Sequence, residues 1–353
     1  MPLYLIERKI KSMANIMINN NCNLTCPYCF ANEYVNKNGV KNITLEDFKT
    51  ALTFIKTGDS TRIGLIGGEP LLHPEFKEIL NILVKDNRVK EVVIFTNGIL
   101  LDKYIMDILH PKVFLLVNVN SPETMGLNNY NKMVDNLDKL YNNYKLGRNI
   151  TIGLNMYREC KDYSYIYDII NITKADKLRA SITVPNSEDS RHVDVISYFK
   201  EMVPVATEIF KNVFNQGAIP FLDCNYLPPC TVSEDEFEVL KNIVQYTLGK
   251  EELAESNLLR KPDCAPIIDI NYDLKAVRCF GLSSVGEIPI VWFENIADLY
   301  SYFDNQFDSL SYNILSSEDC RNCSDRLLKK CTGGCLAYKA DKIANAVQML
   351  NNL

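Results

Sequence analysis

Three cysteines, Cys22, Cys26 and Cys29, fall within the eight residues CNLTCPYC and constrain this chain more than any other feature. Thiolates this close together in a polar loop can bind one inorganic centre. A structural zinc or a closed four-iron cube takes four ligands. Three thiolates on such a cube would leave one iron open to a small molecule. Taken alone, the residues also allow half of a zinc knuckle or a buried cysteine cluster.

The composition excludes several classes of protein. Of the 353 residues, 47% are hydrophobic, enough for one large core or two moderate ones. The charged fraction of 23%, with 15 Gly and 14 Pro, excludes a disordered or collagen-like chain. The net charge is −6 without a basic run, so we expect no nucleic-acid partner. Residues 1–20 lack a signal-peptide pattern and no apolar run could span a bilayer, so we predict a cytoplasmic protein without a membrane partner.

The chain has twelve cysteines, which in a cytoplasmic protein indicate metal rather than disulfides. Three lie near residue 26 and six lie between Cys264 and Cys335, which leaves Cys160, Cys224 and Cys230. Exposed clusters of this kind survive only at low oxygen. The Asn-, Lys- and Ile-rich composition is compatible with an A/T-rich anaerobe.

Short apolar runs alternate with amphipathic segments over residues 13–185 and predict a parallel α/β sheet with right-handed crossovers. The expected strands are Met13–Ile18, Ile63–Ile66, Glu91–Phe95, Val113–Val119, Ile150–Met156 and Leu178–Val184. The expected helices begin after the N-cap Thr44 and cover Glu75–Lys85, Asp102–Leu109, Asn128–Tyr144 and Tyr163–Ile170. Six such units predict an open, partial (β/α)6 barrel of the TIM type, with ligands at the carboxyl ends of the strands.

Polar motifs follow the ends of these expected strands. The cysteine loop follows the first strand, Gly67-Gly68-Glu69-Pro70 the second, and Thr96-Asn97-Gly98 the third. The amides of Asn118 and Asn120 end the fourth strand, and that of Asn155 lies near the end of the fifth. Because unrelated motifs would not share one rim, this agreement favours a functional site over ordinary turns. By contrast, His73 is interpreted as a helix-entry residue.

The cysteine loop and the Gly-Gly-Glu-Pro and Thr-Asn-Gly motifs resemble those of the radical S-adenosylmethionine (radical SAM) superfamily. The resemblance implies a [4Fe-4S] cluster on Cys22, Cys26 and Cys29 whose open iron is chelated by SAM. One electron from the cluster would then cleave SAM to a 5′-deoxyadenosyl radical. By the same resemblance, the SAM-binding residues would be Tyr28, Phe30, Gly67, Gly68, Glu69, Pro70, Thr96, Asn97, Asn118 and Asn155.

Beyond the barrel we expect an amphipathic helix over Arg191–Phe214, a linker over Gly217–Pro229, and a helix from Ser233 to about Leu248. The predicted domains are therefore a barrel core over residues 1–190, a helical bridge over 191–260, and a cysteine-rich domain over 261–353.

The second cysteine group begins with Cys264-x14-Cys279, which reads as a hairpin with its turn near Tyr272. It continues as Cys320-x2-Cys323-x7-Cys331-x3-Cys335. The regular spacing indicates metal, and zinc is the generic alternative. The arrangement resembles the SPASM extension of radical SAM enzymes, which implies auxiliary [4Fe-4S] clusters.

The SPASM resemblance departs from the family pattern in three places: Leu274 stands where a glycine is usual, x7 is longer than usual, and no cysteine follows Cys335. By analogy, Cys264, Cys279 and Cys335 would hold one cluster, and Cys320, Cys323 and Cys331 the other. Each set is one thiolate short. The missing ligands would come from Cys224 and Cys230, with Cys160 left over. The alternatives are an iron left open for substrate, a single auxiliary cluster, or Cys224 or Cys230 as a hydrogen-atom donor.

The resemblance implies hydrogen abstraction from a peptide or protein substrate, as in the maturation of ribosomally made peptides by thioether or carbon–carbon crosslinks or epimerisation. The first strand begins by residue 13, so leader recognition is expected from a separate protein or from the extension. A flavodoxin or ferredoxin is the expected electron donor. The alternatives are a radical SAM dehydrogenase acting on a small molecule or haem precursor, and a non-catalytic iron–sulfur or zinc scaffold.

Overall fold

The computed structural model describes residues 13–29, 31–32, 34–36, 39–183, 194–222, 227–248, 267–310 and 313–351. Ten strands form one sheet in the order β10-β9-β8-β1-β2-β3-β4-β5-β6-β7. The strands of the barrel are β1 (Ala14–Asn19), β2 (Arg62–Gly67), β3 (Glu91–Thr96), β4 (Val113–Val119), β5 (Ile150–Met156), β6 (Lys177–Ile182) and β7 (Ile219–Leu222). Each of these pairs in parallel with the next. The predicted parallel barrel is therefore confirmed.

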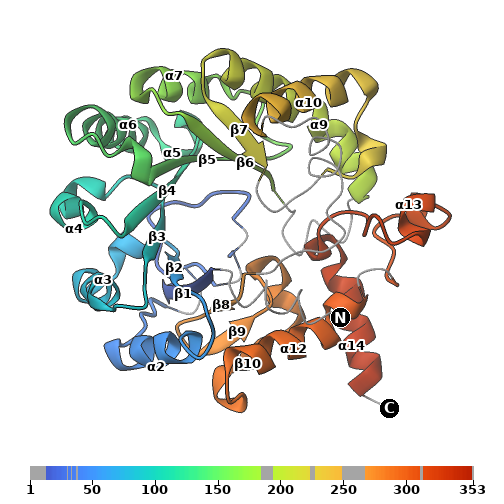
Figure 1. The fold of residues 1–353 in the computed structure, drawn as a ribbon, viewed down its shortest axis with the longest axis horizontal. Coiled ribbons are helices and arrows are strands. Elements are labelled where there is room, and N and C mark those ends of the chain that lie inside the picture. Colours follow the sequence, from blue (N-terminus) through green and yellow to red (C-terminus); the bar gives the residue numbers. More distant parts are fainter. Residues whose placement is uncertain are drawn as a thin grey trace.

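Helices cover the outer face of this curved sheet (Figure 1). They are α2 (Leu45–Ile55), α3 (Phe76–Lys85), α4 (Ile105–Ile108), α5 (Pro122–Met125), α6 (Leu127–Asp138), α7 (Ser164–Thr173), α9 (Val195–Asn215) and α10 (Glu234–Leu248). The predicted N-cap Thr44 is confirmed, because its side chain accepts a hydrogen bond from Asp47 N at 3.0 Å. Residues 191–193 of the predicted long helix lie outside the described part of the chain, and α9 accounts for the rest.

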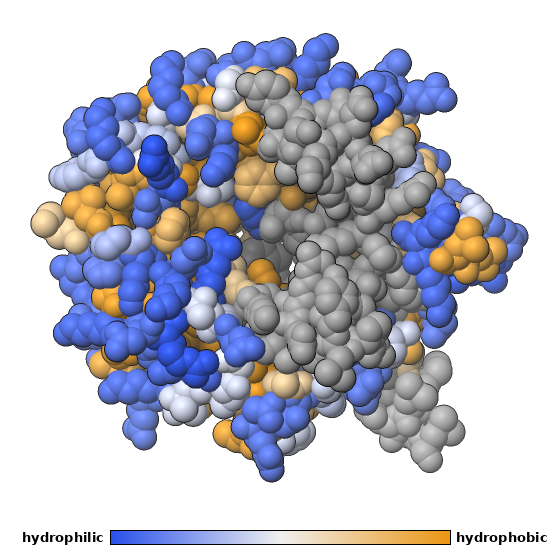
Figure 2. Space-filling model, viewed as in Figure 1, coloured by the Kyte–Doolittle hydropathy of each residue, from blue (hydrophilic) through white to orange (hydrophobic). Residues whose placement is uncertain are grey.

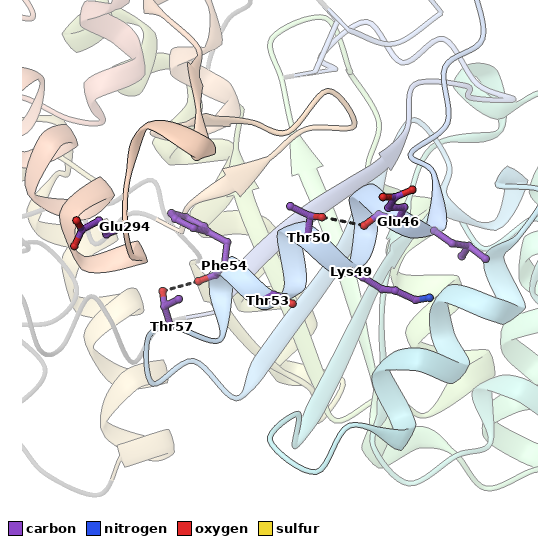
Figure 3. Close-up of a pocket in the computed structure, with 8 residues that line it drawn as sticks. Glu46, Lys49, Thr50, Thr53, Phe54, Thr57 and Glu294 are labelled. Atoms are coloured by element: carbon purple, nitrogen blue, oxygen red, sulfur yellow. Dashed lines mark hydrogen bonds between the residues drawn. The ribbon is translucent and has the colours of Figure 1, made fainter.

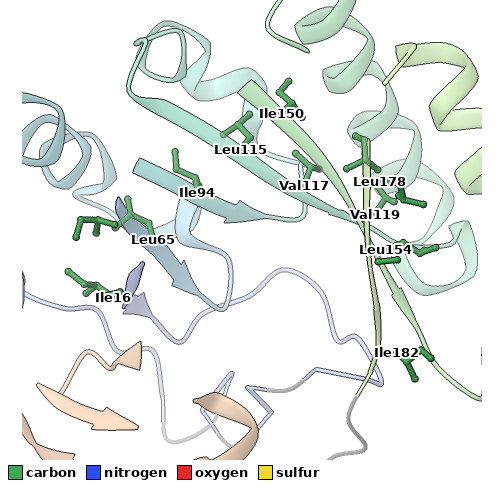
Figure 4. Close-up of a cluster of buried hydrophobic side chains, with 14 of the residues drawn as sticks. Ile16, Leu65, Ile94, Leu115, Val117, Val119, Ile150, Leu154, Leu178 and Ile182 are labelled. Carbon is green, nitrogen blue, oxygen red and sulfur yellow. The ribbon is translucent and has the colours of Figure 1, made fainter. Parts of the chain in front are cut away.

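The core lies between sheet and helices and follows from a period of two along each strand. Every second side chain of a strand is buried in one apolar cluster, as are Ile16 of β1, Leu65 of β2, Ile94 of β3 and Leu115 of β4 (Figure 4). The intervening residues of β1–β6 face the inside of the barrel, and several are polar. The burial pattern thus separates a helix-covered core from an inner surface that offers amides and hydroxyls.

The prediction of a linker over Gly217–Pro229 was wrong, because β7 lies within it and extends the parallel sheet by a seventh strand. The linker was predicted from Pro228 and Pro229, which exclude a helix, but β7 lies upstream of both and contains Pro220. A proline cannot donate to a sheet ladder, but β7 is an edge strand, where proline is tolerated.

The predicted hairpin is confirmed as β8 (Asp269–Ile270) and β9 (Lys275–Val277), which pair antiparallel. It does not stand apart from the barrel, because β8 pairs in parallel with β1 and β10 (Ile288–Pro289) extends the same sheet. The remaining helices are α12 (Ile296–Gln306), α13 (Ser324–Leu327) and α14 (Ala340–Asn351). Most of the coloured surface in Figure 2 is hydrophilic, and the apolar patch at its right edge corresponds to α13, where Leu327 and Leu328 are exposed. No helix in the described ranges is both long enough and apolar enough to span a membrane.

Candidate active site at the carboxyl ends of the strands

The cysteine loop follows β1 directly, at the predicted rim. Cys22, Cys26 and Cys29 are partly buried, and Cys29 N donates to Cys26 O at 3.1 Å in a tight turn. Burial raises the pKa of the Cys22 thiol to about 12, and the charges of Glu69, Cys26 and Cys29 act in the same direction. Burial and the charge of Cys29 raise the pKa of Cys26 to about 11. Burial also raises the pKa of Cys29, so it disfavours all three thiolates, and a bound cation would stabilise them.

No three His, Cys, Asp or Glu side chains in the described ranges gather tightly enough to hold one metal ion. Four thiolates about 2.3 Å from one zinc lie about 3.8 Å apart by tetrahedral geometry. An iron–sulfur cube binds its ligands at separate corners and tolerates a wider spacing.

The Gly67-Gly68 pair serves the cysteine loop directly. A Cβ on Gly68 would lie 2.2 Å from Asn21 O and 2.9 Å from Cys22 N, so any side chain here would displace the start of the loop. Glu69 N donates to Asn21 O at 2.7 Å, and Gly68 N donates to Asn19 O at 3.1 Å. The backbone at Gly67 and Gly68 therefore approaches closely the loop that carries the thiols.

The Glu69 carboxylate is fully buried and joins the second and third motifs. It accepts hydrogen bonds from Thr96 Oγ1 at 2.8 Å, Asn97 N at 2.8 Å and Leu71 N at 3.2 Å. Burial raises its pKa from 4.5 to about 7, although these three hydrogen bonds act in the opposite direction. Pro70 begins the short 3-10 helix η1 (Pro70–Leu72), for which Glu69 is the N-cap.

Asn97 extends this network to the cysteine loop, because its Nδ2 donates to Asn23 Oδ1 at 2.8 Å. The structure therefore brings the cysteine, Gly-Gly-Glu-Pro and Thr-Asn-Gly motifs together. Sequence reasoning missed Asn23, whose position inside the cysteine loop was the available signal.

Tyr28 connects the loop to β4 and β5. Its hydroxyl donates to Asn120 Oδ1, while Asn120 Nδ2 lies 3.8 Å from Cys26 Sγ. The Tyr28 ring packs on Tyr157, with 4.9 Å between ring centroids. A hydrogen bond with Asn155 also acts on the Tyr28 hydroxyl. Tyr157, which follows the end of β5, was missed by the sequence analysis, and Phe30 lies outside the described residues.

Asn118 offers an unused acceptor at this rim. Its Oδ1 is buried and has no hydrogen-bond partner in the described structure. A Cβ on the neighbouring Gly153 would lie 2.6 Å from that oxygen. A buried amide oxygen without a partner fits a ligand hydroxyl.

His73, by contrast, has a structural role, as predicted. Its Nδ1 accepts from Glu75 N at 3.0 Å, so Nε2 donates to Ile43 O at 3.0 Å. Both ring nitrogens are used within the fold.

The second group of cysteines includes Cys230, which lies in the 3-10 helix η5 (Pro229–Thr231) and is exposed. Desolvation of its thiol nevertheless raises its pKa to about 11, and the charges of Cys331, Cys320 and Cys323 act in the same direction. Cys279 and Cys335 are partly buried. Cys264 and Cys224 lie outside the described residues.

Lys339 is buried beside this group, with 1% of its surface exposed. Its Nζ donates to Thr332 O at 2.6 Å. Desolvation lowers the pKa of Lys339 to about 8, whereas the charges of Cys320, Cys331 and Cys335 act in the opposite direction. Sequence reasoning missed this residue, because nothing in the sequence distinguishes it from the exposed Lys342.

A separate groove of about 790 Å³ lies on the outside of the barrel, along α2 (Figure 3). Its lining includes Glu46, Lys49, Thr53 and Glu294 and no cysteine. It therefore takes no part in the site at the strand ends.

An open parallel barrel with three thiols on the loop after its first strand defines a class of iron–sulfur enzyme. Residues 16–161 match the family model described as "Radical SAM superfamily". Residues 16–161 therefore form a domain of the radical SAM superfamily, which confirms the resemblance seen in the motifs. Membership implies a [4Fe-4S] cluster and SAM as cofactors.

Similarity to individual proteins points in two directions. A GTP 3′,8-cyclase of Alkaliphilus oremlandii is 24% identical over 73% of this chain and 92% of its own length. A probable GTP 3′,8-cyclase of Methanocaldococcus jannaschii is 29% identical over 60% of this chain and 65% of its own length.

Crystal structures of Streptococcus suis SuiB share the fold over 92% of this chain. The structure bound to S-adenosylmethionine has a TM-score of 0.62, 14% identity and 73% of SuiB covered. The one bound to the precursor peptide SuiA has a TM-score of 0.59, 14% identity and 72% covered.

The residues present fit the cofactors that the family implies. Cys22, Cys26 and Cys29 supply three soft donors, one fewer than a closed cube requires. The unpartnered Asn118 Oδ1 supplies a buried acceptor on a strand next to the one bearing Asn155.

Proposed function

We propose that this radical SAM enzyme modifies a peptide or protein, by a thioether or carbon–carbon crosslink, epimerisation or a related reaction. The observation that carries the proposal is the extent of the structural similarity to SuiB, which spans 92% of this chain. SuiB is also seen bound to a precursor peptide. The matched length is too great for the barrel alone, so the similarity includes part of the cysteine-rich extension.

In this proposal, Cys22, Cys26 and Cys29 hold the front cluster, and the Glu69 network fixes the loop that presents them. When bound, the cluster and SAM supply a 5′-deoxyadenosyl radical that abstracts hydrogen from substrate. Tyr28 and Tyr157 form an aromatic wall beside the loop, while Asn118 and Asn155 offer amides to the ribose or adenine. These groups orient ligands and exclude water from the rim.

A small-molecule substrate is the second candidate, because the relatives in sequence are named GTP 3′,8-cyclases. A nucleoside triphosphate requires several cations for recognition. The inner-face residues toward the carboxyl ends of β4–β6 are mainly amides and hydroxyls, such as Asn118, Asn155 and Ser181, with Arg179 among them. The net charge of the chain is −6. The sparse positive charge favours a peptide.

The proposal also includes a separate leader-binding protein, a flavodoxin or ferredoxin as electron donor, and auxiliary clusters on the extension. The proposal also places domain boundaries near residues 190 and 260. Strand β7 belongs to the segment between these boundaries and β8 to the cysteine-rich segment, and both strands extend the barrel sheet.

The test incubates the anaerobically reconstituted enzyme with SAM, dithionite and a short peptide encoded beside its gene, with GTP in a parallel reaction. We expect the peptide to lose two hydrogens on crosslinking, or to take up deuterium from D2O on epimerisation, as seen by mass spectrometry. Turnover of GTP with the peptide unchanged would favour the second candidate.

A further inference from the structure

The Gly333-Gly334 turn brings two distant parts of the extension into contact. Gly333 N donates to Cys331 Sγ at 3.2 Å, and a Cβ on Gly333 would lie 3.2 Å from Cys320 Sγ. On its other side, a Cβ on Gly334 would lie 3.9 Å from Pro228 Cγ. Both glycines have positive φ, +78° and +99°, where a side chain would be strained. The turn thus has two thiols beside Gly333, and it has Pro228, two residues before Cys230, beside Gly334.

Local hydrogen bonds hold the Cys230 segment and the Cys320–Cys323 segment in place. Thr231 is buried, and its Oγ1 and N donate to Pro228 O at 2.7 and 2.9 Å. Arg326 Nε donates to Cys320 O at 2.7 Å. Cys323 belongs to the same short turn as Cys320, because Cys323 N donates to Cys320 O at 3.4 Å. The Gly333-Gly334 turn therefore lies between this cysteine group and the segment that carries Cys230.

The buried Lys339 supplies the opposite charge at this place. A buried ammonium requires a nearby negative charge or full hydrogen bonding. Lys339 donates to Thr332 O, the residue between Cys331 and the Gly333 turn. Its charge also acts on the Cys320 thiol. Thiolates bound to iron would provide the negative charge that neutral thiols lack.

We propose that Cys230 completes a four-thiolate site with Cys320, Cys323 and Cys331 that holds a fully ligated [4Fe-4S] cluster, with Lys339 as its buried counter-charge. This inference rests on the auxiliary clusters of the proposed function and deepens it. A cube with four thiolates has no iron left open. The site therefore transfers electrons and does not bind substrate, in contrast to the three-thiol loop at the barrel rim.

The first test counts iron and sulfide in a Cys22/Cys26/Cys29→Ala background, which removes the front cluster, after anaerobic reconstitution with ferrous iron and sulfide. We expect Cys230→Ser to lose one to four irons, because a cube deprived of a ligand loses either one iron or all of them. Cys323→Ser should lose as many, whereas Cys160→Ser, a partly buried cysteine outside the set, should lose none. Circular dichroism verifies that each variant is folded.

Two outcomes distinguish a wrong assignment of Cys230 from the absence of auxiliary clusters. If Cys230→Ser keeps its iron while Cys323→Ser loses it, the assignment of Cys230 is overturned and the enzyme's proposed activity stands. If the background binds no iron at all, the auxiliary clusters themselves are refuted.

The second test addresses Lys339 by redox titration followed by electron paramagnetic resonance. In the same background, Lys339→Met should retain the iron and shift the midpoint potential of one cluster to lower values, because the reduced cluster carries more negative charge. Lys339→Arg should restore the potential, and Lys342→Met, an exposed neighbour, should leave it unchanged. An unaltered potential in Lys339→Met would refute the role of Lys339.

Discussion

Glu69 is the residue on which the rim most depends, because one buried carboxylate accepts three hydrogen bonds from two loops. Its raised pKa of about 7 means that the folded protein binds a proton more tightly than the unfolded chain between pH 4.5 and 7. Stability from this group is therefore complete below pH 4.5 and is lost as the pH rises through 7, by at most about 3 kcal/mol.

Glu69→Gln tests this linkage. At pH 5 the wild-type carboxyl is itself protonated and, like the amide, presents a hydrogen toward one of the three donors, so we expect a loss of about 1 kcal/mol or less. The penalty should shrink as the pH rises to 8, because only the wild type loses stability over that range. Urea unfolding at pH 5, 6, 7 and 8 measures both, and a penalty that grows with pH would contradict the assignment.

Gly68 fixes the position of the cysteine loop by the absence of a side chain. Gly68→Ala places a Cβ 2.2 Å from Asn21 O, a backbone atom that cannot turn aside. We expect a loss of about 1–3 kcal/mol from overpacking, together with reduced iron at the front cluster. Gly126→Ala is the control, because Gly126 has a positive φ but open space around it. Equal iron contents in the two variants would show that Gly68 does not support the loop.

The β8–β9 hairpin is held to the barrel by a buried ionic network. Arg278 is 1% exposed, and its Nε donates to Asp308 Oδ1 at 2.7 Å. Its charge also stabilises the buried carboxylate of Asp269, which accepts from Asn15 Nδ2 at 2.7 Å. This network joins β1 to the cysteine-rich extension.

Arg278→Met removes the cation and leaves Asp269 and Asp308 uncompensated. We expect a loss of about 3–5 kcal/mol in the free energy of unfolding. Arg321→Met breaks an exposed pair with Glu318 and should cost below about 1 kcal/mol. Denaturant unfolding of both variants measures the difference, and similar costs would contradict a supporting role for the network.

Among the strands, the longer ones could be predicted from the sequence and the shortest could not. Strands such as Val113–Val119 and Ile150–Met156 were predicted with correct bounds, because each is a seven-residue, mainly apolar run between helical segments. The two-residue strand β8 is too short to show a pattern, and its pairing with β1 and β9 defines it. Leu274, placed where the family usually has a glycine, adopts φ +58°, so the backbone retains the turn despite the change of residue.

In the whole molecule, the topology explains why the motifs form one site. Parallel strands end at the same edge, so motifs 27 or more residues apart meet there, as Glu69 and Thr96 do. The sequence predicted this convergence but not the individual partners, because hydrogen bonds such as Asn97 to Asn23 depend on loop conformation. The sequence also suggested Cys224 and Cys230 as further cluster ligands but could not assign either to one cluster, and the assignment of Cys230 to the Cys320 group is proposed from the structure.

The central claim is that the three-thiol loop supports radical chemistry. The direct measurement is 5′-deoxyadenosine released from SAM by the anaerobically reconstituted enzyme with dithionite, compared with the Cys22/Cys26/Cys29→Ala variant. We predict release by the wild type, and loss of release in the variant while iron on the extension is retained. Equal release from both proteins, or none from a wild type whose front loop holds its iron, would contradict the account.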